Sequence, residues 1–69
     1  MSKIEYSKDG KWKIRLAQYK EGKLAGKYIV SLSRFAGFFW DAKKWKLLDD
    51  KREAKVLYAE YKKEMEAEA

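Results

Sequence analysis

Residues 11–19 read KWKIRLAQY, and this stretch decides the fold. In an extended chain, successive side chains point to opposite sides. Trp12, Ile14 and Leu16 therefore share one side. The other side begins with three cations: Lys11, Lys13 and Arg15. This period of two, apolar on one side and charged on the other, is typical of a β-strand that is buried on one face only.

The stretches on either side extend the same pattern. Residues 27–35 also alternate, with large apolar side chains on one side: Tyr28, Val30 and Leu32. Residues 3–6 alternate over a shorter length, and the Asp9-Gly10 step after them is typical of a hairpin turn. Residues 20–26 contain two glycines and predict a loop. We therefore expect three antiparallel strands, at residues 3–6, 11–19 and 27–35.

Residues 34–45, RFAGFFWDAKKW, hold five aromatic rings and allow two interpretations. In the first, residues 38–40 and 45–48 form a fourth strand region, folded back on itself by a turn at residues 41–44. In the second, the segment is an irregular loop in which Phe35, Phe38 and Trp45 pack around a helix end as a small additional core. Gly37 breaks or bulges the third strand in either case.

The end of the chain predicts a helix over residues 50–66. Asp50 and Glu53 have the spacing of a capping box, in which an Asp cap is followed three residues later by Glu. An apolar stripe then recurs at helical spacing: Ala54, Leu57, Tyr58, Tyr61 and Met65. Residues 64–69 place acids at the negative end of the helix dipole, so we expect the last residues to fray.

These elements predict one small α+β domain over residues 1–69. An antiparallel meander of three or four strands is covered on one face by a C-terminal helix (βββα or ββββα). We expect Leu57, Tyr58 and Tyr61 of the helix to pack on the apolar sides of residues 11–19 and 27–35. The opposite face of the sheet then remains basic, with aromatic side chains near its borders.

The composition limits the chemistry of this 69-residue chain. It has no Cys and no His, which excludes disulfides, zinc sites built on those ligands, and the commonest catalytic bases and nucleophiles. We expect no enzyme activity, no metal and no cofactor. No apolar run approaches the ~20 residues of a membrane span, and no signal-peptide pattern opens the chain, so a cytoplasmic location is the default.

The charge is unevenly distributed along the chain. Residues 1–48 hold twelve Lys or Arg against four Asp or Glu, whereas residues 49–69 hold five against seven. The region of the predicted sheet therefore carries a net charge of +8, within a chain whose total net charge is +6. This asymmetry indicates a polyanionic partner, although lysines that merely keep a small protein soluble are the alternative.

Basic and aromatic residues together form the candidate site. Alternate cations on one strand stand about 7 Å apart, close to the spacing of phosphates along an extended strand, and aromatic rings stack on bases. Serines can donate to phosphate oxygens. The candidate nucleic-acid-binding residues are Lys11, Lys13, Arg15, Tyr19, Ser31, Ser33, Phe35, Phe39, Trp40, Lys43, Lys44 and Lys46.

Two resemblances of architecture agree with this site. A four-stranded sheet followed by one helix is similar to the unit repeated in Whirly and Pur-alpha proteins, which implies binding of single-stranded nucleic acid across the sheet and pairing of units. A three-stranded sheet with a C-terminal helix resembles the arm-type DNA-binding domains of tyrosine recombinases, with Gly10-Lys11-Trp12 opening a strand and Arg52-Glu53-Ala54 opening the helix. That likeness implies a sheet in the major groove of duplex DNA.

Three functions therefore stay open at this point. The first is binding of single-stranded DNA or RNA, because rings outnumber the Arg, Asn and Gln side chains suited to reading duplex base edges. The second is a small interaction or inhibitor protein of the phage or mobile-element type, with the Phe35–Trp45 cluster as a hot spot for a protein partner. The third is binding of duplex DNA. A homodimer is compatible with each of them, and we expect no membrane partner.

Overall fold

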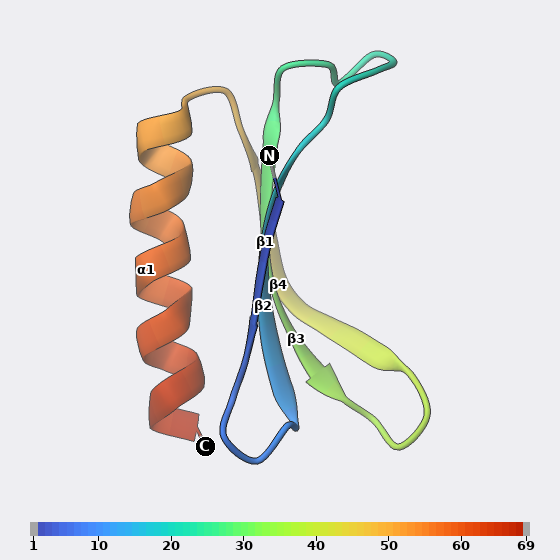
Figure 1. The fold of residues 1–69 in the computed structure, drawn as a ribbon, viewed down its shortest axis with the longest axis vertical. Coiled ribbons are helices and arrows are strands. Elements are labelled where there is room, and N and C mark those ends of the chain that lie inside the picture. Colours follow the sequence, from blue (N-terminus) through green and yellow to red (C-terminus); the bar gives the residue numbers. More distant parts are fainter. Residues whose placement is uncertain (1, 69) are drawn as a thin grey trace.

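The computed structural model describes residues 2–68, which form four strands followed by one helix (Figure 1). The strands form one antiparallel sheet in the order β1-β2-β3-β4, with the helix packed on one face. This confirms the α+β fold with a meander sheet and a C-terminal helix. The elements are β1 (Ser2–Tyr6), β2 (Trp12–Gln18), β3 (Tyr28–Phe35), β4 (Trp40–Leu48) and α1 (Lys51–Glu68).

The core lies between α1 and the two central strands. We call this side of the sheet the covered face and the opposite side the free face. Ile14 of β2 and Val30 of β3 are completely buried on the covered face, as the alternation of residues 11–19 and 27–35 predicts. The remaining buried apolar side chains of this core are Trp12, Leu16, Tyr28, Leu32, Leu48, Ala54, Tyr58, Tyr61 and Met65, with Leu57 partly buried against them.

The helix begins as predicted and ends later than predicted. The Asp50 carboxylate accepts a hydrogen bond from the Arg52 amide at 3.1 Å, so Asp50 is the N-cap. The helix extends to Glu68, two residues beyond the predicted end at residue 66. The reason is tertiary, because Met65 is buried and Glu64 pairs with Lys44 of β4 at 2.6 Å, which holds the last turns on the sheet.

The fourth strand differs from the expected arrangement. Residues 41–44 do not form a turn; they are the middle of β4, which is continuous from Trp40 to Leu48. The chain reverses at residues 36–39 instead, where Gly37 adopts a φ of 95° that side chains larger than hydrogen rarely tolerate. The partners jump from Leu32↔Lys44 to Ser33↔Ala42, so β4 carries a bulge at Lys43.

The three aromatic residues that could have wrapped the helix end do not form a second core there. Phe35, Phe38 and Trp45 are all exposed. Trp45 is paired with Ser31, and it alternates with the covered-face residues of β4, which places it on the free face. None of the aromatic residues of segment 34–45 belongs to the core, so this segment is left available for other contacts.

Candidate functional site

The free face is built from cross-strand rows that the register defines. In one row, Arg15 of β2 lies beside Ser31 of β3, which lies beside Trp45 of β4. In the next row, Lys13 lies beside Ser33. The register thus places two cations of one strand next to two serines of its neighbour, as the sequence predicts.

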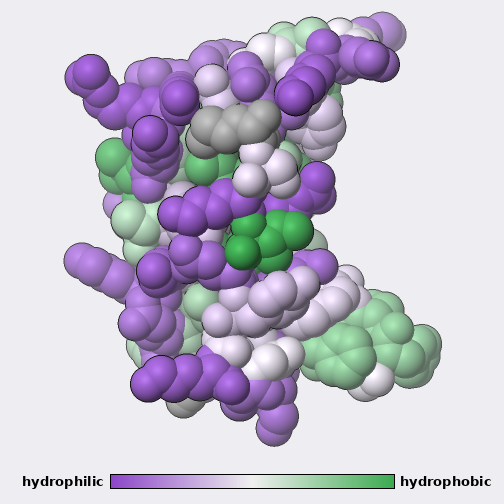
Figure 2. All heavy atoms as spheres, viewed as in Figure 1, coloured by the Kyte–Doolittle hydropathy of each residue, from purple (hydrophilic) through white to green (hydrophobic). Residues whose placement is uncertain are grey.

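The free face is concave. Figure 1 shows that the ends of β3 and β4 near residues 36–39 bend away from α1, and that the β2–β3 loop at the other end leans the same way. Figure 2 shows the resulting hollow on the side of the molecule opposite α1. This trough has a volume of about 560 Å³ and is lined by Lys13, Arg15, Tyr19, Leu24, Ile29, Ser31, Ser33, Trp40, Ala42, Trp45 and Leu47.

The Trp40 side chain crosses the free face at one end of the trough. Its ring centroid lies 5.2 Å from that of Phe35 and 5.9 Å from that of Tyr6, which belongs to the opposite edge strand. The Lys13 ammonium lies 4.5 Å from the centre of the same ring, a cation–π contact. This crossing accounts for the burial of Ser33, which is only 6% exposed although it lies on the free face.

Trp45 is the most accessible ring inside the trough. It is 60% exposed, and Ser31, Ala42 and Leu47, which line the trough with it, have smaller side chains than tryptophan. An indole held on a strand in this way has a free π-face, which is what a stacking platform for a base requires. Tyr19 stands at the other end of the trough and is also exposed.

The charges of the trough have one sign. Among the described residues that line it, Lys13 and Arg15 carry charge and none is an acid. Two acids of the sheet region, Asp9 and Asp41, are engaged elsewhere. Asp9 sits in the β1–β2 turn, where hydrogen bonds from the Ser7 hydroxyl at 2.5 Å and the Lys11 amide at 3.0 Å hold its pKa below the usual range. Asp41 pairs with Lys43 at 2.8 Å. The trough is therefore a basic surface.

Six of the predicted site residues lie together in the trough, and the lysines of β4 do not. The six are Lys13, Arg15, Tyr19, Ser31, Trp40 and the buried Ser33. Lys44 and Lys46 pair with covered-face residues of β3, so they face the side of α1. Lys44 donates a hydrogen bond to Glu64, which raises the pKa of Lys44. Lys43 lies at the bulge beside Asp41.

The remaining predicted residues lie at the end of the β3–β4 hairpin. Phe35 contacts Trp40, and the Phe35 amide donates to the Lys11 carbonyl at 2.7 Å, which brings Lys11 to the same end of the sheet. Residues 36–39, which we call the hairpin tip, carry Phe39 packed edge-on against Phe38 with ring centroids 5.2 Å apart. Phe38 is 88% exposed. This tip is the apolar projection in Figure 2.

Two exposed aromatic residues of the free face were not among the predicted site residues. The sequence pattern places Trp45 in a fourth strand, in an additional core or in the Phe35–Trp45 cluster, and it places Tyr6 in a short strand. A signal existed for both. Tyr6 alternates with the charged Lys3 and Glu5, and Trp45 alternates with Lys44 and Lys46, so each ring must face away from those charges in a strand.

Comparisons with known proteins add no identification, because no family model, no curated protein and no solved structure matches the chain. Within residues 2–68, no group of three or more acidic side chains is placed to hold a metal ion. The helix of the described chain is too polar to cross a membrane.

Proposed function

We propose that this protein binds single-stranded nucleic acid in the trough of the free face. The observation that carries the proposal is the exposed Trp45 ring on a concave sheet face, where Lys13 and Arg15 are the charged side chains among the described residues that line the trough. Phosphates of an extended strand would contact the two cations, while bases would stack on Trp45 and Tyr19. Each stacked base contributes roughly 1–3 kcal/mol, and this contribution tolerates any base sequence. The proposal includes a cytoplasmic location for the protein.

The shape of the face favours a single strand over a duplex. Sheets read duplex DNA with strands in the major or the minor groove, and an element that enters the major groove must be convex or narrow. The free face is hollow, with the hairpin tip projecting at one end (Figures 1 and 2). A flexible strand can follow such a hollow, whereas a duplex would rest on its rims without reaching Arg15 or Trp45. We therefore place duplex binding behind single-strand binding.

A second candidate function rests on the hairpin tip. Phe38 and Phe39 form an exposed apolar pair at the end of a hairpin, which suits insertion into a pocket of a protein partner. In that case the protein would be an interaction or inhibitor module of the kind a phage or mobile element encodes. This candidate uses different residues from the trough, so the two functions can be separated by mutation.

The test is a titration of the protein with unstructured single-stranded DNA, single-stranded RNA and duplex DNA at two salt concentrations. We expect the single strands to quench tryptophan fluorescence and to bind more weakly at high salt, because phosphate contacts release counterions. Equal binding of duplex and single strands would favour the duplex interpretation. No binding of any nucleic acid at physiological salt would contradict the proposal.

Two variants assign the binding surface. Trp45→Ala should cost roughly 1–3 kcal/mol of single-strand binding, because it removes the stacking platform, and it should leave the fold intact. Phe38→Ala is the matched control, because it removes an even more exposed ring at the hairpin tip, outside the trough lining. If Phe38→Ala weakens binding and Trp45→Ala does not, the strand lies on the hairpin tip and not in the trough.

A further inference from the structure

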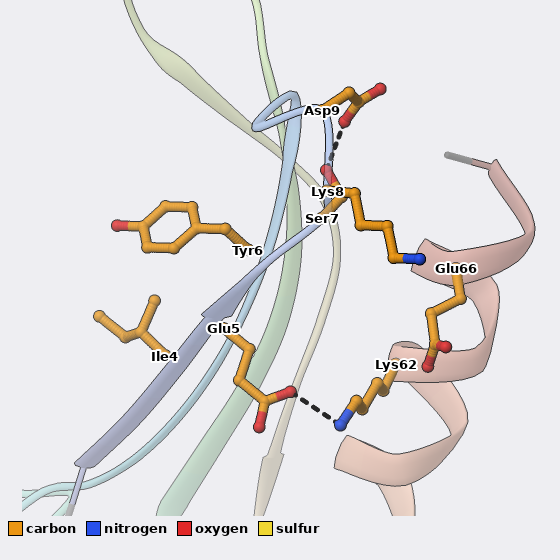
Figure 3. A pocket seen from close by; sticks show the side chains of 8 residues that line it. All are labelled: Ile4, Glu5, Tyr6, Ser7, Lys8, Asp9, Lys62 and Glu66. Atoms are coloured by element: carbon orange, nitrogen blue, oxygen red, sulfur yellow. Dashed lines mark hydrogen bonds and ion pairs between the residues drawn. The ribbon is translucent and has the colours of Figure 1, made fainter.

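The edge strand β1 has no pairing partner on its outer side within the described chain. The helix α1 reaches it through side chains only, with Lys62 paired to Glu5 at 3.1 Å and the Lys3 ammonium 5.0 Å from the centre of the Tyr58 ring. The sheet ends at β1, and α1 packs mainly on β2 and β3 and to a smaller extent on β4. A groove of about 870 Å³ therefore remains between β1 and the last turns of α1. Figure 3 shows Glu5 and Lys62 pointing toward each other across this groove, while Ile4 and Tyr6 point to the opposite side.

The backbone of β1 offers a regular ladder to a further strand. The Ser7 amide donates to the Trp12 carbonyl of β2 at 2.9 Å, so the amides of odd-numbered residues face β2. By the alternation of an antiparallel pair, the N–H and C=O groups of Ser2, Ile4 and Tyr6 face outward. The strand contains no proline, and its pairing with β2 is regular from Ser2 to Tyr6. It therefore lacks two features with which edge strands often prevent further pairing, a proline and a bulge, and its two charged side chains, Lys3 and Glu5, are of opposite sign.

The side chains of β1 are complementary to a second copy of the same strand. We propose that the protein forms a symmetric homodimer in which two β1 strands pair antiparallel about Ile4. In this register Ile4 faces Ile4 of the partner subunit, and Lys3 faces Glu5 of the partner subunit on the covered side. Opposite charges directly across a strand pair are favourable, and the two-fold axis forms this pair twice.

The exposed apolar side chains of β1 support the same pairing. Ile4 is 45% exposed and Tyr6 is 58% exposed, both on the free face. In the dimer the two Ile4 side chains meet at the axis, which removes apolar surface from water. The two α1 helices stay apart, because each lies over its own β2 and β3 with the uncovered β1 strands between them.

The other edge of the sheet does not offer this complementarity. The β4 strand carries Lys43, Lys44 and Lys46, and two copies of β4 would place these cations against one another. Lysines on an edge strand are a common means of preventing pairing. A closed dimer through β1 is therefore favoured over β4 pairing. The dimer rests on the β1 edge alone and not on the proposed function, although it joins two free faces into one eight-stranded surface.

The first measurement is the mass of the full chain in solution by light scattering or sedimentation, over a range of protein concentrations. We expect twice the 8.2 kDa of one chain. Ile4→Pro removes an outward amide and should give a monomer, with an unchanged circular dichroism spectrum, because proline is tolerated on an edge where the amide has no partner. A wild-type monomer at every concentration, or open-ended oligomers, would overturn the proposal.

Charge variants test the register. Lys3→Glu and Glu5→Lys each place like charges opposite one another in a homodimer, so each should weaken dimerisation on the order of tenfold. Mixing the two variants should restore a heterodimer, because each cross-strand pair then again joins Lys to Glu. Lys55→Glu on the exposed side of α1 changes the net charge as Lys3→Glu does and should leave the dimer intact.

Three results of these variants count against the inference. Dimers that persist in Ile4→Pro would show that β1 is not the interface. Mixtures that stay monomeric would show that the strands do not pair about Ile4. Loss of the dimer in Lys55→Glu would show that net charge rather than the Lys3–Glu5 pairing controls association.

Discussion

On the covered face of the sheet, Ile14 and Val30 are fully buried beneath α1, whereas their sequence neighbours Arg15 and Ser31 face the open trough. The same two strands thus supply the core on one side and the candidate binding surface on the other. Successive residues of a strand point to opposite faces. Each core residue of β2 and β3 therefore has a sequence neighbour whose side chain lies on the free face. Stability and recognition can therefore be altered separately in this small domain.

The largest expected difference between the faces is in stability. Ile14→Ala should lower the free energy of unfolding by roughly 2–5 kcal/mol, because it leaves a cavity in a fully packed site. Arg15→Ala, one residue further on, should change it by about 0.5 kcal/mol or less. Urea unfolding followed by circular dichroism measures both. Similar losses for the two variants would show that the free face is also part of the core.

A second difference concerns pH. Burial raises the pKa of Tyr58 on the covered face to about 12, with a further contribution from the Glu5 carboxylate. The folded protein therefore holds this proton more tightly than the unfolded chain, whose tyrosines ionise near pH 10. The stabilising effect is complete below pH 10 and is lost as pH rises toward 12, about 2 kcal/mol in all.

Unfolding free energies measured across that alkaline range check this expectation. Tyr58→Phe should abolish the part of the alkaline loss that belongs to Tyr58. Its hydroxyl is buried and has no hydrogen-bond partner within the described chain, so the variant should not be less stable at neutral pH. An unchanged alkaline profile in Tyr58→Phe would mean that other groups, such as the lysines, account for the whole loss.

A smaller effect on stability is expected at the hairpin tip, which forms one end of the trough. Gly37→Ala should destabilise by roughly 1–2 kcal/mol, because the φ of 95° disfavours any residue with a Cβ, although open space surrounds the position. Thermal unfolding compares this variant with Ala36→Gly, a change at the neighbouring tip position. If Gly37→Ala is neutral, the hairpin tip relaxes to another turn and does not fix the end of the trough.

The smallest effect on stability, and the most informative about function, is expected for the trough cations. Lys13→Ala with Arg15→Ala should reduce the salt dependence of single-strand binding by about 0.7 log units per lost phosphate contact. Lys44→Ala with Lys46→Ala removes the same charge from the covered side and should leave the salt slope nearly unchanged. Equal slopes for the two double variants would show that net charge, and not the trough, attracts the nucleic acid.

The sequence alone predicts the central part of this fold well. The alternation at residues 11–19 and 27–35 identifies both faces of β2 and β3, because a strand with one buried face must alternate. The stripe from Ala54 to Met65 identifies the helix for the corresponding reason at a period of 3.6. The trough residues that come from these strands, Lys13, Arg15 and Ser31, follow from the same argument.

The fourth strand could not be predicted in the same way. The edge strand β4 is covered by α1 over only part of its length, and it carries Lys44 and Lys46 even on its covered side. Its sequence therefore does not alternate between apolar and polar residues. The bulge at Lys43 then shifts the pattern by one residue. Without the register, neither the inward direction of those lysines nor the outward direction of Trp45 is visible. These are the positions where the expected site and the observed trough differ.

The bulge at Lys43 also has a genetic consequence. Because it amounts to a single residue on one strand, removing the Lys43 codon would return β4 to a regular ladder with β3 and reduce the local twist. Deletion of this one codon would therefore flatten the sheet and make the free face less hollow. Insertion or deletion of a whole codon in this short stretch of the gene keeps the reading frame. Such a change would therefore reshape the trough while the core remains intact.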